Sequence, residues 1–317
     1  MIHTRSLLPL SLLLALPSWG QGSFEPIRYG DMDHWVVRHI KESGVIGGNT
    51  KTLYEVGPDE SIGNNTPYVP KGGTPWASSN VMAKVSGITK TNTSVYREKR
   101  GDGYCCKMMT HIEKVKVLGL VNINVLAAGS VFLGQMREPI TGTKDGLKAI
   151  NWGLPFTKRP RAIRFDYKVE VPGDPNRIRL TGFSSRGTVD GPDLCMAVVY
   201  LQKREEDDDG NVTAKRVGTM VATFSSSTNG WINHASFPIR YGDISKTPNF
   251  IPNLMGLRND YYVKNKFGES VVLKETGWAS PDETPTHIYV QFSSSHGGAF
   301  IGTPGNTFWV DNVGLEY

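Results

Sequence analysis

Carboxyl groups are the first residues in this 317-residue sequence that could do chemistry. A glycosidase places two carboxyls about 5 Å or about 6.5–9.5 Å apart across a groove, where they act as acid and as base or nucleophile. Asp190 and Asp193 lie three residues apart across Gly-Pro and could share a site with Arg186, although we favour a polar turn. No motif around any of the candidates requires a catalytic pair. Outside the acidic run at 205–209 the candidates are Asp166, Glu170, Asp190, Asp193 and Glu275.

A histidine after three serines is a second combination with catalytic side chains. His296 follows serines at 293–295, which invites a nucleophile and a base. Adjacent residues seldom present their side chains to each other as a triad requires, and no Gly-x-Ser-x-Gly elbow is present. The sequence also has no phosphate-binding loop, dinucleotide fingerprint or zinc-protease helix. We therefore do not favour these reaction classes.

Aromatic side chains offer a different chemistry, the stacking of sugar rings. The face of a Trp or Tyr can contact the C–H groups of a sugar while Asn and Ser side chains bind its hydroxyls, and no catalytic pair is needed. Each of these aromatics could instead be a core residue. The candidates for sugar contact are Trp152, Trp231, Tyr261, Tyr262 and Trp278.

Strand patterns surround these candidates along most of the chain. Alternating apolar, β-branched and aromatic residues predict strands at 81–90, 93–99, 104–117, 161–171, 194–203, 214–224, 231–239 and 270–273. The acidic run should form the solvated tip of a hairpin between the strands at 194–203 and 214–224, because charge keeps an exposed strand pair soluble. Two long connections rich in Pro, Gly and Asn lie at 57–79 and 244–285. We expect an all-β fold in a single domain over 21–317.

The last two predicted strands, at 288–292 and 308–317, are joined by a loop of Ser, Gly, Pro and Asn. Strong turn formers between two apolar runs predict an antiparallel pair. Strict alternation in the final strand would place Phe308 and Val310 on one face and Val313 and Leu315 on the other.

The closing strand, Trp309 to Tyr317, resembles that of jelly-roll carbohydrate-binding modules, in which an Asp precedes the final apolar positions. The segments at 127–134 (AAGSVFLG) and 151–160 (NWGLPFTKRP) are similar to segments of a family called the putative carbohydrate metabolism domain, found mostly in secreted proteins of glycan-degrading Bacteroidetes. Matching segments occur in the same order over nearly the whole chain after residue 31. The resemblance implies a jelly-roll β-sandwich of antiparallel strands with long irregular loops, and a role in handling glycans.

The same resemblance implies a structural calcium ion. In such modules the opening Gly-Asp turn and the closing Asp often share one, and the matching ligands here are Asp31 or Asp33 with Asp311. Calcium takes roughly six to eight oxygen ligands, so backbone carbonyls would have to complete the set. In the alternative interpretation, Asp31 caps a turn and Asp311 accepts backbone hydrogen bonds at a strand edge.

Residues 1–20 predict a signal peptide for export. Arg5 precedes an apolar run from Leu7 to Leu16, which is too short to span a bilayer, and small residues lie near a cleavage point at Gly20. The expected location is secreted, periplasmic or cell-surface. The short apolar run predicts no membrane span. The net charge of +5 is small and the basic residues are interspersed with acids, so we expect no nucleic-acid partner.

Export would permit disulfides, but the chain has only three cysteines, Cys105, Cys106 and Cys195. Adjacent cysteines point to opposite faces of a strand, so at most one of the pair could reach Cys195. We favour buried free thiols, because Cys behaves as a small hydrophobe. A zinc site lacks the usual ligand spacing.

Three functions remain open at this point. A secreted glycan-binding protein of a polysaccharide-handling system needs the least, since exposed aromatics beside a shallow groove suffice. A glycoside hydrolase would require a paired set of carboxyls and a raised carboxyl pKa. A surface adhesion or assembly module would show a broad apolar patch instead. We favour the glycan-binding protein.

Overall fold

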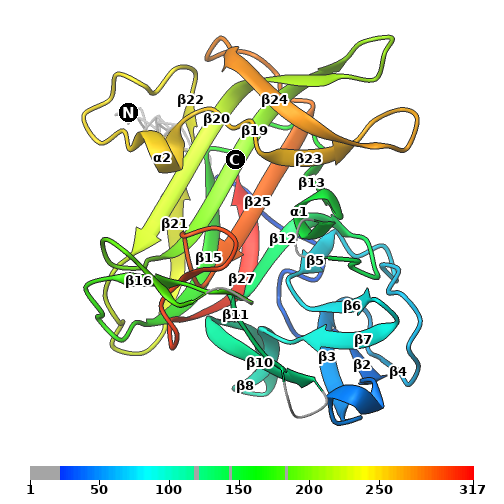
Figure 1. The fold of residues 1–317 in the computed structure, drawn as a ribbon. Helices are drawn as coiled ribbons and strands as arrows, with labels where there is room; N and C mark the ends of the chain where they lie inside the picture. Colours follow the sequence, from blue (N-terminus) through cyan, green and yellow to red (C-terminus); the bar gives the residue numbers. More distant parts are fainter. Residues whose placement is uncertain (1–21, 118–120, 143–144, 183–184) are drawn as a thin grey trace, which may run out of the picture.

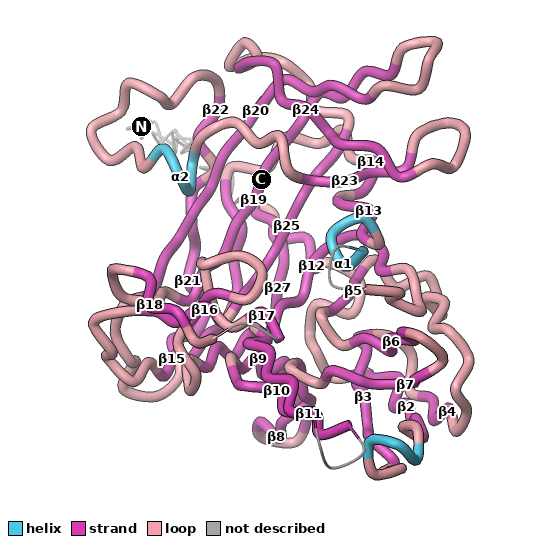
Figure 2. The backbone as a smooth tube through the Cα atoms, in the orientation of Figure 1, coloured by secondary structure: helices cyan, strands magenta, loops and turns pink. Residues whose placement is uncertain are grey.

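The computed structural model describes residues 22–317, apart from 118–120, 143–144 and 183–184 (Figure 1). Strands make up most of the backbone, and helices occur only as short turns (Figure 2). The predicted all-β sandwich of largely antiparallel strands is therefore confirmed. The predicted signal peptide at 1–20 lies outside the described residues. No helix in the described part of the chain is long and apolar enough to cross a membrane.

One layer of the sandwich is a sheet of six strands, called here the facing sheet, with the order β21-β15-β27-β9-β8 and β1 paired with β27. The C-terminal strand lies at its centre, which explains why that strand is apolar along most of its length. The bounds are β1 (Phe24–Pro26), β8 (Val95–Arg100), β9 (Gly103–Met109), β15 (Ala162–Glu170), β21 (Ile232–Pro238) and β27 (Thr307–Glu316).

The other layer is a sheet of ten strands, called the large sheet, with the order β13-β12-β25-β19-β20-β24-β23; β5, β14 and β22 pair with β12, β25 and β20. The bounds are β5 (Trp76–Ser78), β12 (Ser130–Met136), β13 (Ile150–Trp152), β14 (Leu154–Pro155), β19 (Cys195–Glu206), β20 (Val212–Phe224), β22 (Arg240–Tyr241), β23 (Tyr261–Lys264), β24 (Ser270–Trp278) and β25 (His287–Ser293). The predicted hairpin is confirmed, since β19 and β20 pair antiparallel and the acidic run lies at the tip.

Smaller sheets cover one end of the sandwich (Figure 1). They form the three-stranded sheets β3-β2-β4, β10-β11-β17 and β18-β16-β26 and the hairpin β6-β7. Their bounds are β2 (Trp35–Lys41), β3 (Thr50–Val56), β4 (Glu60–Ile62), β6 (Val81–Val85), β7 (Ile88–Asn92), β10 (His111–Val117), β11 (Val121–Ala127), β16 (Arg177–Arg179), β17 (Thr181–Gly182), β18 (Gly187–Val189) and β26 (Ile301–Gly302). The helical turns are η1 (Gly44–Ile46), α1 (Asp145–Lys148) and α2 (Pro252–Met255).

Aromatic rings fill the core between the two layers. Phe165 and Phe308 of the facing sheet and Phe292 of the large sheet are fully buried. The ring centroid of Phe292 lies 4.9 Å from that of Phe165 and 6.2 Å from that of Phe308. Burying one such side chain contributes about 1.5–3 kcal/mol, so these contacts hold the layers together. Strand β19 is buried on both faces, because Tyr200 and its neighbours pack in a second apolar cluster on the outer face of the large sheet.

The predicted pairing of the last two strands is wrong. Strand β25 lies in the large sheet and β27 in the facing sheet, so the connection between them passes from one layer to the other. Turn-forming residues suit a crossover as well as a tight hairpin, and the sequence pattern does not distinguish the two. The segment predicted as one strand at 104–117 likewise divides at Thr110 into β9 and β10, and the segment at 81–90 folds into the hairpin β6-β7.

A bulge interrupts the alternation predicted for the final strand. Asp166 of β15 pairs with Asp311 and Arg164 pairs with Gly314, so β27 carries one extra residue over this interval. Asn312 has a φ of 52°, a left-handed conformation that Asn tolerates better than most residues. Val313 consequently faces the same core as Phe308, and the predicted division of faces is wrong beyond residue 311.

The three cysteines are buried and free, as predicted. Burial raises the pKa of the Cys105 thiol to about 12, so it stays protonated at neutral pH. These thiols therefore serve as small core residues.

Candidate functional site

A cleft of about 530 Å³ lies on the outer face of the large sheet, where the smaller sheets pack against it. We call this surface the cleft. The large sheet contributes Ser130, Ile150, Trp152, Met196, Val198, Tyr200, Tyr261, Gln291 and Ser293. The smaller sheets contribute Val81, Ala83, Lys90, Thr91, Asn92, Glu113, Val125, Leu126 and Ala127. Helices α1 and α2 and connecting segments contribute Ser79, Ala128, Leu147, Asn253, Leu254, Arg258, Asp260, Ser295, His296, Gly298, Ala299 and Phe300.

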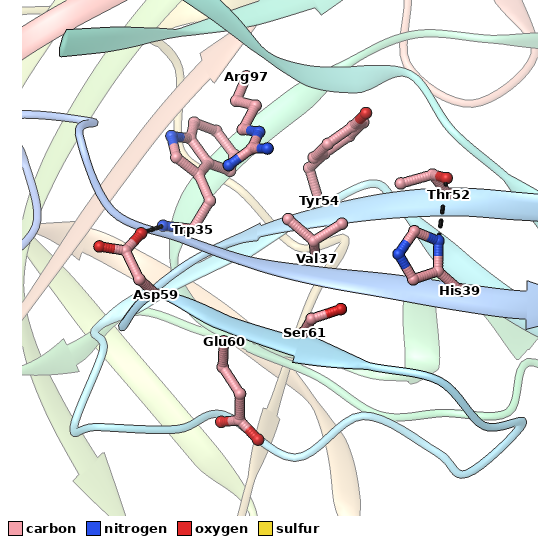
Figure 3. A pocket seen from close by; sticks show the side chains of 9 residues that line it. All are labelled: Trp35, Val37, His39, Thr52, Tyr54, Asp59, Glu60, Ser61 and Arg97. Carbon is pink, nitrogen blue, oxygen red and sulfur yellow. Dashed lines mark hydrogen bonds between the residues drawn. The ribbon is translucent and has the colours of Figure 1, made fainter.

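A second concave surface, of about 540 Å³, lies on the sheet β3-β2-β4 (Figure 3). We call it the groove. Side chains two apart on β2 and β3 share its floor, as the period of a strand requires. It is lined by Trp35, Val37, His39, Thr52, Tyr54, Asp59, Glu60, Ser61 and Arg97.

Packed aromatic rings form one wall of the cleft. The ring of Tyr261 lies 5.3 Å from Trp152 and stacks on Tyr289 at 5.0 Å. Trp152 is 5% exposed and Tyr200 is 1% exposed, whereas Tyr261 is half-buried. Within this aromatic wall Tyr261 is therefore the ring that a ligand can reach, and the other rings fix its orientation. The indole N–H of Trp152 is buried and has no hydrogen-bond partner among the described residues.

Both cations in the cleft are paired with carboxylates. Lys90 Nζ lies 2.5 Å from Glu113 and 2.8 Å from Glu42. Arg258 binds Asp260 through two nitrogens at 2.5 and 2.9 Å. Burial alone would raise the pKa of Glu113, but its hydrogen bonds with His111 and Lys90 lower it. Glu113 is therefore ionised at neutral pH and is not prepared to donate a proton.

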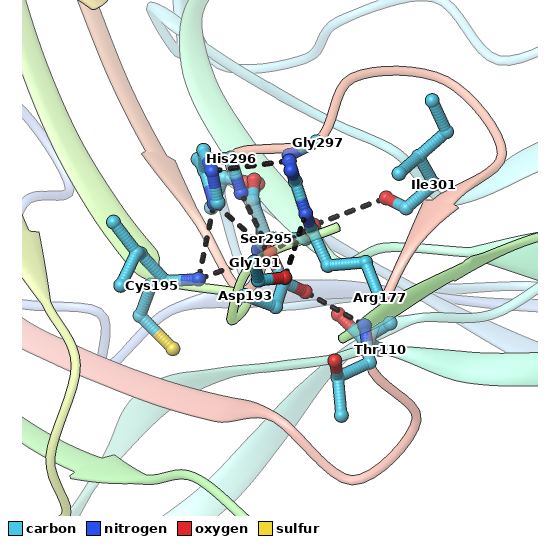
Figure 4. Close-up of polar contacts among 12 residues, drawn as sticks. Thr110, Arg177, Gly191, Asp193, Cys195, Ser295, His296, Gly297 and Ile301 are labelled. Carbon is cyan, nitrogen blue, oxygen red and sulfur yellow. Dashed lines mark hydrogen bonds and ion pairs between the residues drawn. The ribbon is translucent and has the colours of Figure 1, made fainter. Parts of the chain in front are cut away.

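A buried aspartate organises the other end of the cleft (Figure 4). Asp193 accepts hydrogen bonds from the Ser295 hydroxyl at 2.9 Å and from the Thr303 N–H at 2.8 Å, and its carboxylate lies 3.1 Å from His296 Nδ1. Arg177 Nη1 lies 3.2 Å from His296 Nε2. A guanidinium can only donate, so Nε2 accepts from Arg177, while Nδ1 lies 3.0 Å from the Leu194 N–H as well as beside the Asp193 carboxylate.

This network agrees with the expectation that His296 and the serines are not a hydrolytic triad. The Ser295 hydroxyl donates to Asp193, and both nitrogens of His296 are engaged. Asp190 and Asp193 do not form a carboxylate pair with Arg186: Asp190 is exposed and contributes its backbone carbonyl to Arg177, at 2.6 Å. The end of the cleft is therefore a fixed polar corner.

The other carboxylate candidates lie outside the cleft in ion pairs of their own. Glu275 is fully buried and lies 2.5 Å from Arg216. Asp166 lies 2.9 Å from Arg100, and the exposed Glu170 lies 2.9 Å from Lys168. These contacts give each of the three carboxylates a structural partner.

Two of the five predicted sugar-contacting aromatics, Trp152 and Tyr261, line the cleft. The other three lie elsewhere. Trp231 stacks against the guanidinium of Arg100 at 3.8 Å, and Trp278 lies 6.4 Å from the ring of Phe250. Tyr262 is half-buried on the same strand as Tyr261 but is not a lining residue.

The predicted calcium ligands have other partners in this structure. Asp311 is 6% exposed and lies 2.5 Å from Arg100 Nη1. Asp33 Oδ1 accepts the Tyr104 N–H at 2.7 Å, and Asp31 lies at the surface. Among the described residues, no group of three or more His, Cys, Asp or Glu could hold a metal ion. Arg100 supplies a positive charge at Asp311, and calcium binding stays a prediction.

The sequence interpretation missed Arg258 and Asp260 as well as the wall of the cleft opposite Tyr261. Arg258 and Asp260 could have been found locally, because both lie within three residues of Tyr261 in a long connection. Binding residues are common in such connections. The opposite wall comes from β6, β7, β10 and β11, far away in sequence. Only the tertiary fold brings these strands to the large sheet.

Comparison with known proteins links the chain to carbohydrate-related proteins. A crystal structure described as that of a putative glycoside hydrolase from Bacteroides thetaiotaomicron is similar over 85% of this chain and 81% of that chain, with 17% sequence identity and a TM-score of 0.44. No curated protein matches the sequence significantly. The family model described as "Putative carbohydrate metabolism domain" matches residues 50–250. That match includes the β6-β7, β10-β11 and β19-β20 strand pairs, and the chain belongs to this carbohydrate metabolism domain family.

Proposed function

We propose that the protein is a glycan-binding protein of a polysaccharide-handling system and that it binds sugars in the cleft. The observation that carries this proposal is the joint presence of Tyr261, an aromatic ring open to a ligand, and polar side chains at both ends of one cleft. Its volume of about 530 Å³ lies within the range of small-molecule sites, about 300–1,000 Å³. Membership of the carbohydrate metabolism domain family supports a sugar as the ligand.

The cleft offers the two kinds of contact that a sugar uses. The face of Tyr261 can take the C–H side of a pyranose ring. Gln291 and the paired Asp260 can bind hydroxyls at the ring edge, and Ser293 and Ser295 lie at the polar corner. Glu113 and Asp260 are both ion-paired, which supports binding over acid–base catalysis.

The predicted signal peptide supports a secreted, periplasmic or cell-surface location for this function. Fractionation of cells that express the full chain, followed by mass determination of its N-terminus, tests this proposal. A mature protein beginning near residue 21 outside the cytoplasm would support export, and an uncleaved cytoplasmic chain would contradict it.

A glycan-array screen of the protein, followed by calorimetric titration of each hit, tests the proposed function. We expect Tyr261→Ala to weaken binding at least about tenfold, because stacking and ring burial together contribute on the order of 1.4 kcal/mol. Tyr262→Ala is the matched control, since the same ring is removed one position away from the cleft on the same strand.

Three results would count against the proposal. Equal losses in both variants would show that the strand, and not the cleft, matters. Shortened oligosaccharides after overnight incubation of each hit would favour the glycoside hydrolase alternative. Silence on every glycan, with folding verified by circular dichroism, would favour the adhesion or assembly module.

A further inference from the structure

The groove contains an arginine without a carboxylate partner. Arg97 of β8 is exposed, and no carboxylate oxygen of the described residues lies within ion-pair distance of its guanidinium. The guanidinium instead faces aromatic rings: its carbon lies 5.9 Å from the ring centroid of Tyr54 and 4.9 Å from that of Tyr104. The positive charge is thus held by aromatic faces and not neutralised.

Stacking of this kind leaves the hydrogen-bond donors of Arg97 available. A guanidinium meets an aromatic ring through its flat face, whereas its N–H groups point outward in the plane. That planar edge matches a carboxylate or a sulfate through two parallel hydrogen bonds. Arg97 is therefore oriented and still able to bind an anion.

Each acid of the groove has a basic partner at its rim. Asp59 Oδ2 lies 2.7 Å from His34 Nδ1, and Glu60 lies 2.5 Å from Lys71 Nζ. The hydrogen bond with His34 is the main cause that lowers the pKa of Asp59, and the charge of Arg97 contributes less. In Figure 3 Asp59 and Glu60 lie on one side of the groove and Arg97 on the other. While His34 is protonated, the charge left over on this surface is positive.

The remaining lining suits a sugar and not a bare anion. Tyr54 offers a half-buried ring, and Thr52 and Ser61 offer hydroxyls beside it. Trp35 is 1% exposed and its N–H donates to the Met32 carbonyl at 2.7 Å, so it supports the floor and does not stack on a ligand. A volume of about 540 Å³ is large for one inorganic ion.

We propose that the groove binds an acidic sugar, with the carboxylate of a uronic acid or the sulfate of a sulfated residue held by Arg97. This inference rests on the proposed function, since it adds a second class of glycan ligand to the same protein. The anionic group is common to both sources, and the sugar ring contacts Tyr54. The cleft and the groove would then select glycans of different charge.

Calorimetric titration of the full chain with four probes tests this inference. The probes are a galacturonate tetrasaccharide, its methyl ester, a sulfated chondroitin tetrasaccharide and inorganic sulfate. We expect Arg97→Ala to lower the affinity for an acidic tetrasaccharide about 10- to 100-fold, because charge-assisted bidentate contacts are lost. Arg97→Lys should retain part of the affinity, since it keeps the charge and loses the fork. Arg240→Ala, a loss of the same charge at an exposed position of β22, should change nothing.

Each outcome separates this inference from the proposed function. A loss confined to the galacturonate or to the sulfated probe identifies the source of the anion and supports the inference. Unchanged binding of both acidic probes by folded Arg97→Ala overturns it, as does equal binding of the methyl ester. If neutral glycans bind in a Tyr261-dependent way and acidic ones do not bind at all, the inference fails while the proposed function stands. Binding of inorganic sulfate as tightly as the tetrasaccharides would also overturn it.

Discussion

The cleft and the groove have nearly the same volume, about 530 and 540 Å³, and differ in how their charges are arranged. In the cleft both cations, Lys90 and Arg258, are ion-paired with carboxylates. In the groove both carboxylates are paired at the rim, and Arg97 has no carboxylate partner among the described residues. The cleft is therefore suited to neutral sugars and the groove to acidic ones.

Under the two proposals above, one fold would distinguish glycans by pairing charges and not by adding them. A paired cation still donates hydrogen bonds to hydroxyls, but it gains little from an anion because its counter-ion is already present. A cation stacked on rings keeps its full attraction. The selectivity of each surface should thus follow the partner of its arginine, Asp260 for Arg258 and tyrosine rings for Arg97.

The largest expected effect on glycan affinity comes from a substitution that fills the cleft and leaves the groove unchanged. Ala83 lies on β6 and lines the cleft. We expect Ala83→Trp to weaken cleft-bound glycans at least about 100-fold, because the indole would occupy the space of a sugar ring. Binding of acidic tetrasaccharides in the groove should stay within about twofold.

Val85→Trp is the control for that substitution, since Val85 lies on the same strand, is 44% exposed and does not line the cleft. Titration of both variants with neutral and acidic ligands gives the comparison. A parallel loss of both ligand classes in Ala83→Trp would show that the two surfaces are not independent.

A smaller effect should follow when the charge pattern of the groove is copied into the cleft. Asp260→Asn keeps the shape of the side chain and removes the counter-charge of Arg258. We expect the variant to bind acidic oligosaccharides about 3- to 10-fold more tightly than the unmodified chain, through a second site that depends on Tyr261. Asp282→Asn, an equal charge change at an exposed position, should give no such gain. A folded Asp260→Asn protein without the added binding would contradict the charge-pairing argument.

The groove should also respond to pH, with an effect of about two- to threefold on affinity. The hydrogen bond with Asp59 is the main cause that raises the pKa of His34, and the charges of Asp31 and Asp33 add to it. Below that raised pKa, His34 is protonated and neutralises Asp59. As the pH rises through it, Asp59 keeps an uncompensated negative charge beside the ligand.

The affinity of the groove for an acidic tetrasaccharide should therefore fall as the pH rises through the raised pKa of His34, and the affinity of the cleft for a neutral glycan should stay constant. Titrations at pH values on both sides of that pKa measure the step. In His34→Gln the step should be absent. An equal step in the variant would assign the pH dependence to another group.

Long strands with local partners could be predicted from the sequence, whereas the surfaces made by distant strands could not. The hairpin of β19 and β20 could be predicted because alternating apolar residues and an acidic tip are both patterns of neighbouring residues in the sequence. The separation of β25 and β27 into two sheets was not, since nothing in a turn-rich loop states which sheet the next strand joins.

The same distinction applies to the two surfaces. Trp152 and Tyr261 could be proposed from residue type alone, yet their burial and orientation come from Tyr289 and Phe132 on other strands. Arg97 lies in a strand of alternating charges, a pattern that indicates a solvated face. The proposed role of Arg97 in anion binding depends on Tyr54 and Tyr104, which the fold brings beside it from β3 and β9.

The smallest expected effect concerns calcium, and it extends the argument about charge pairing to the core. Arg100 lies 2.5 Å from Asp311 and 2.9 Å from Asp166, so a side chain of the protein already supplies the cation that two buried carboxylates need. We expect EDTA to change the Tm by less than about 1 °C, because only a ligand bound to the native state raises it. A larger fall in Tm that calcium reverses would instead support a calcium ion at Asp31, Asp33 and Asp311. Arg100→Ala sharpens the test: it leaves Asp166 and Asp311 without their shared cation, so this variant should gain a stabilisation by calcium that the unmodified chain lacks.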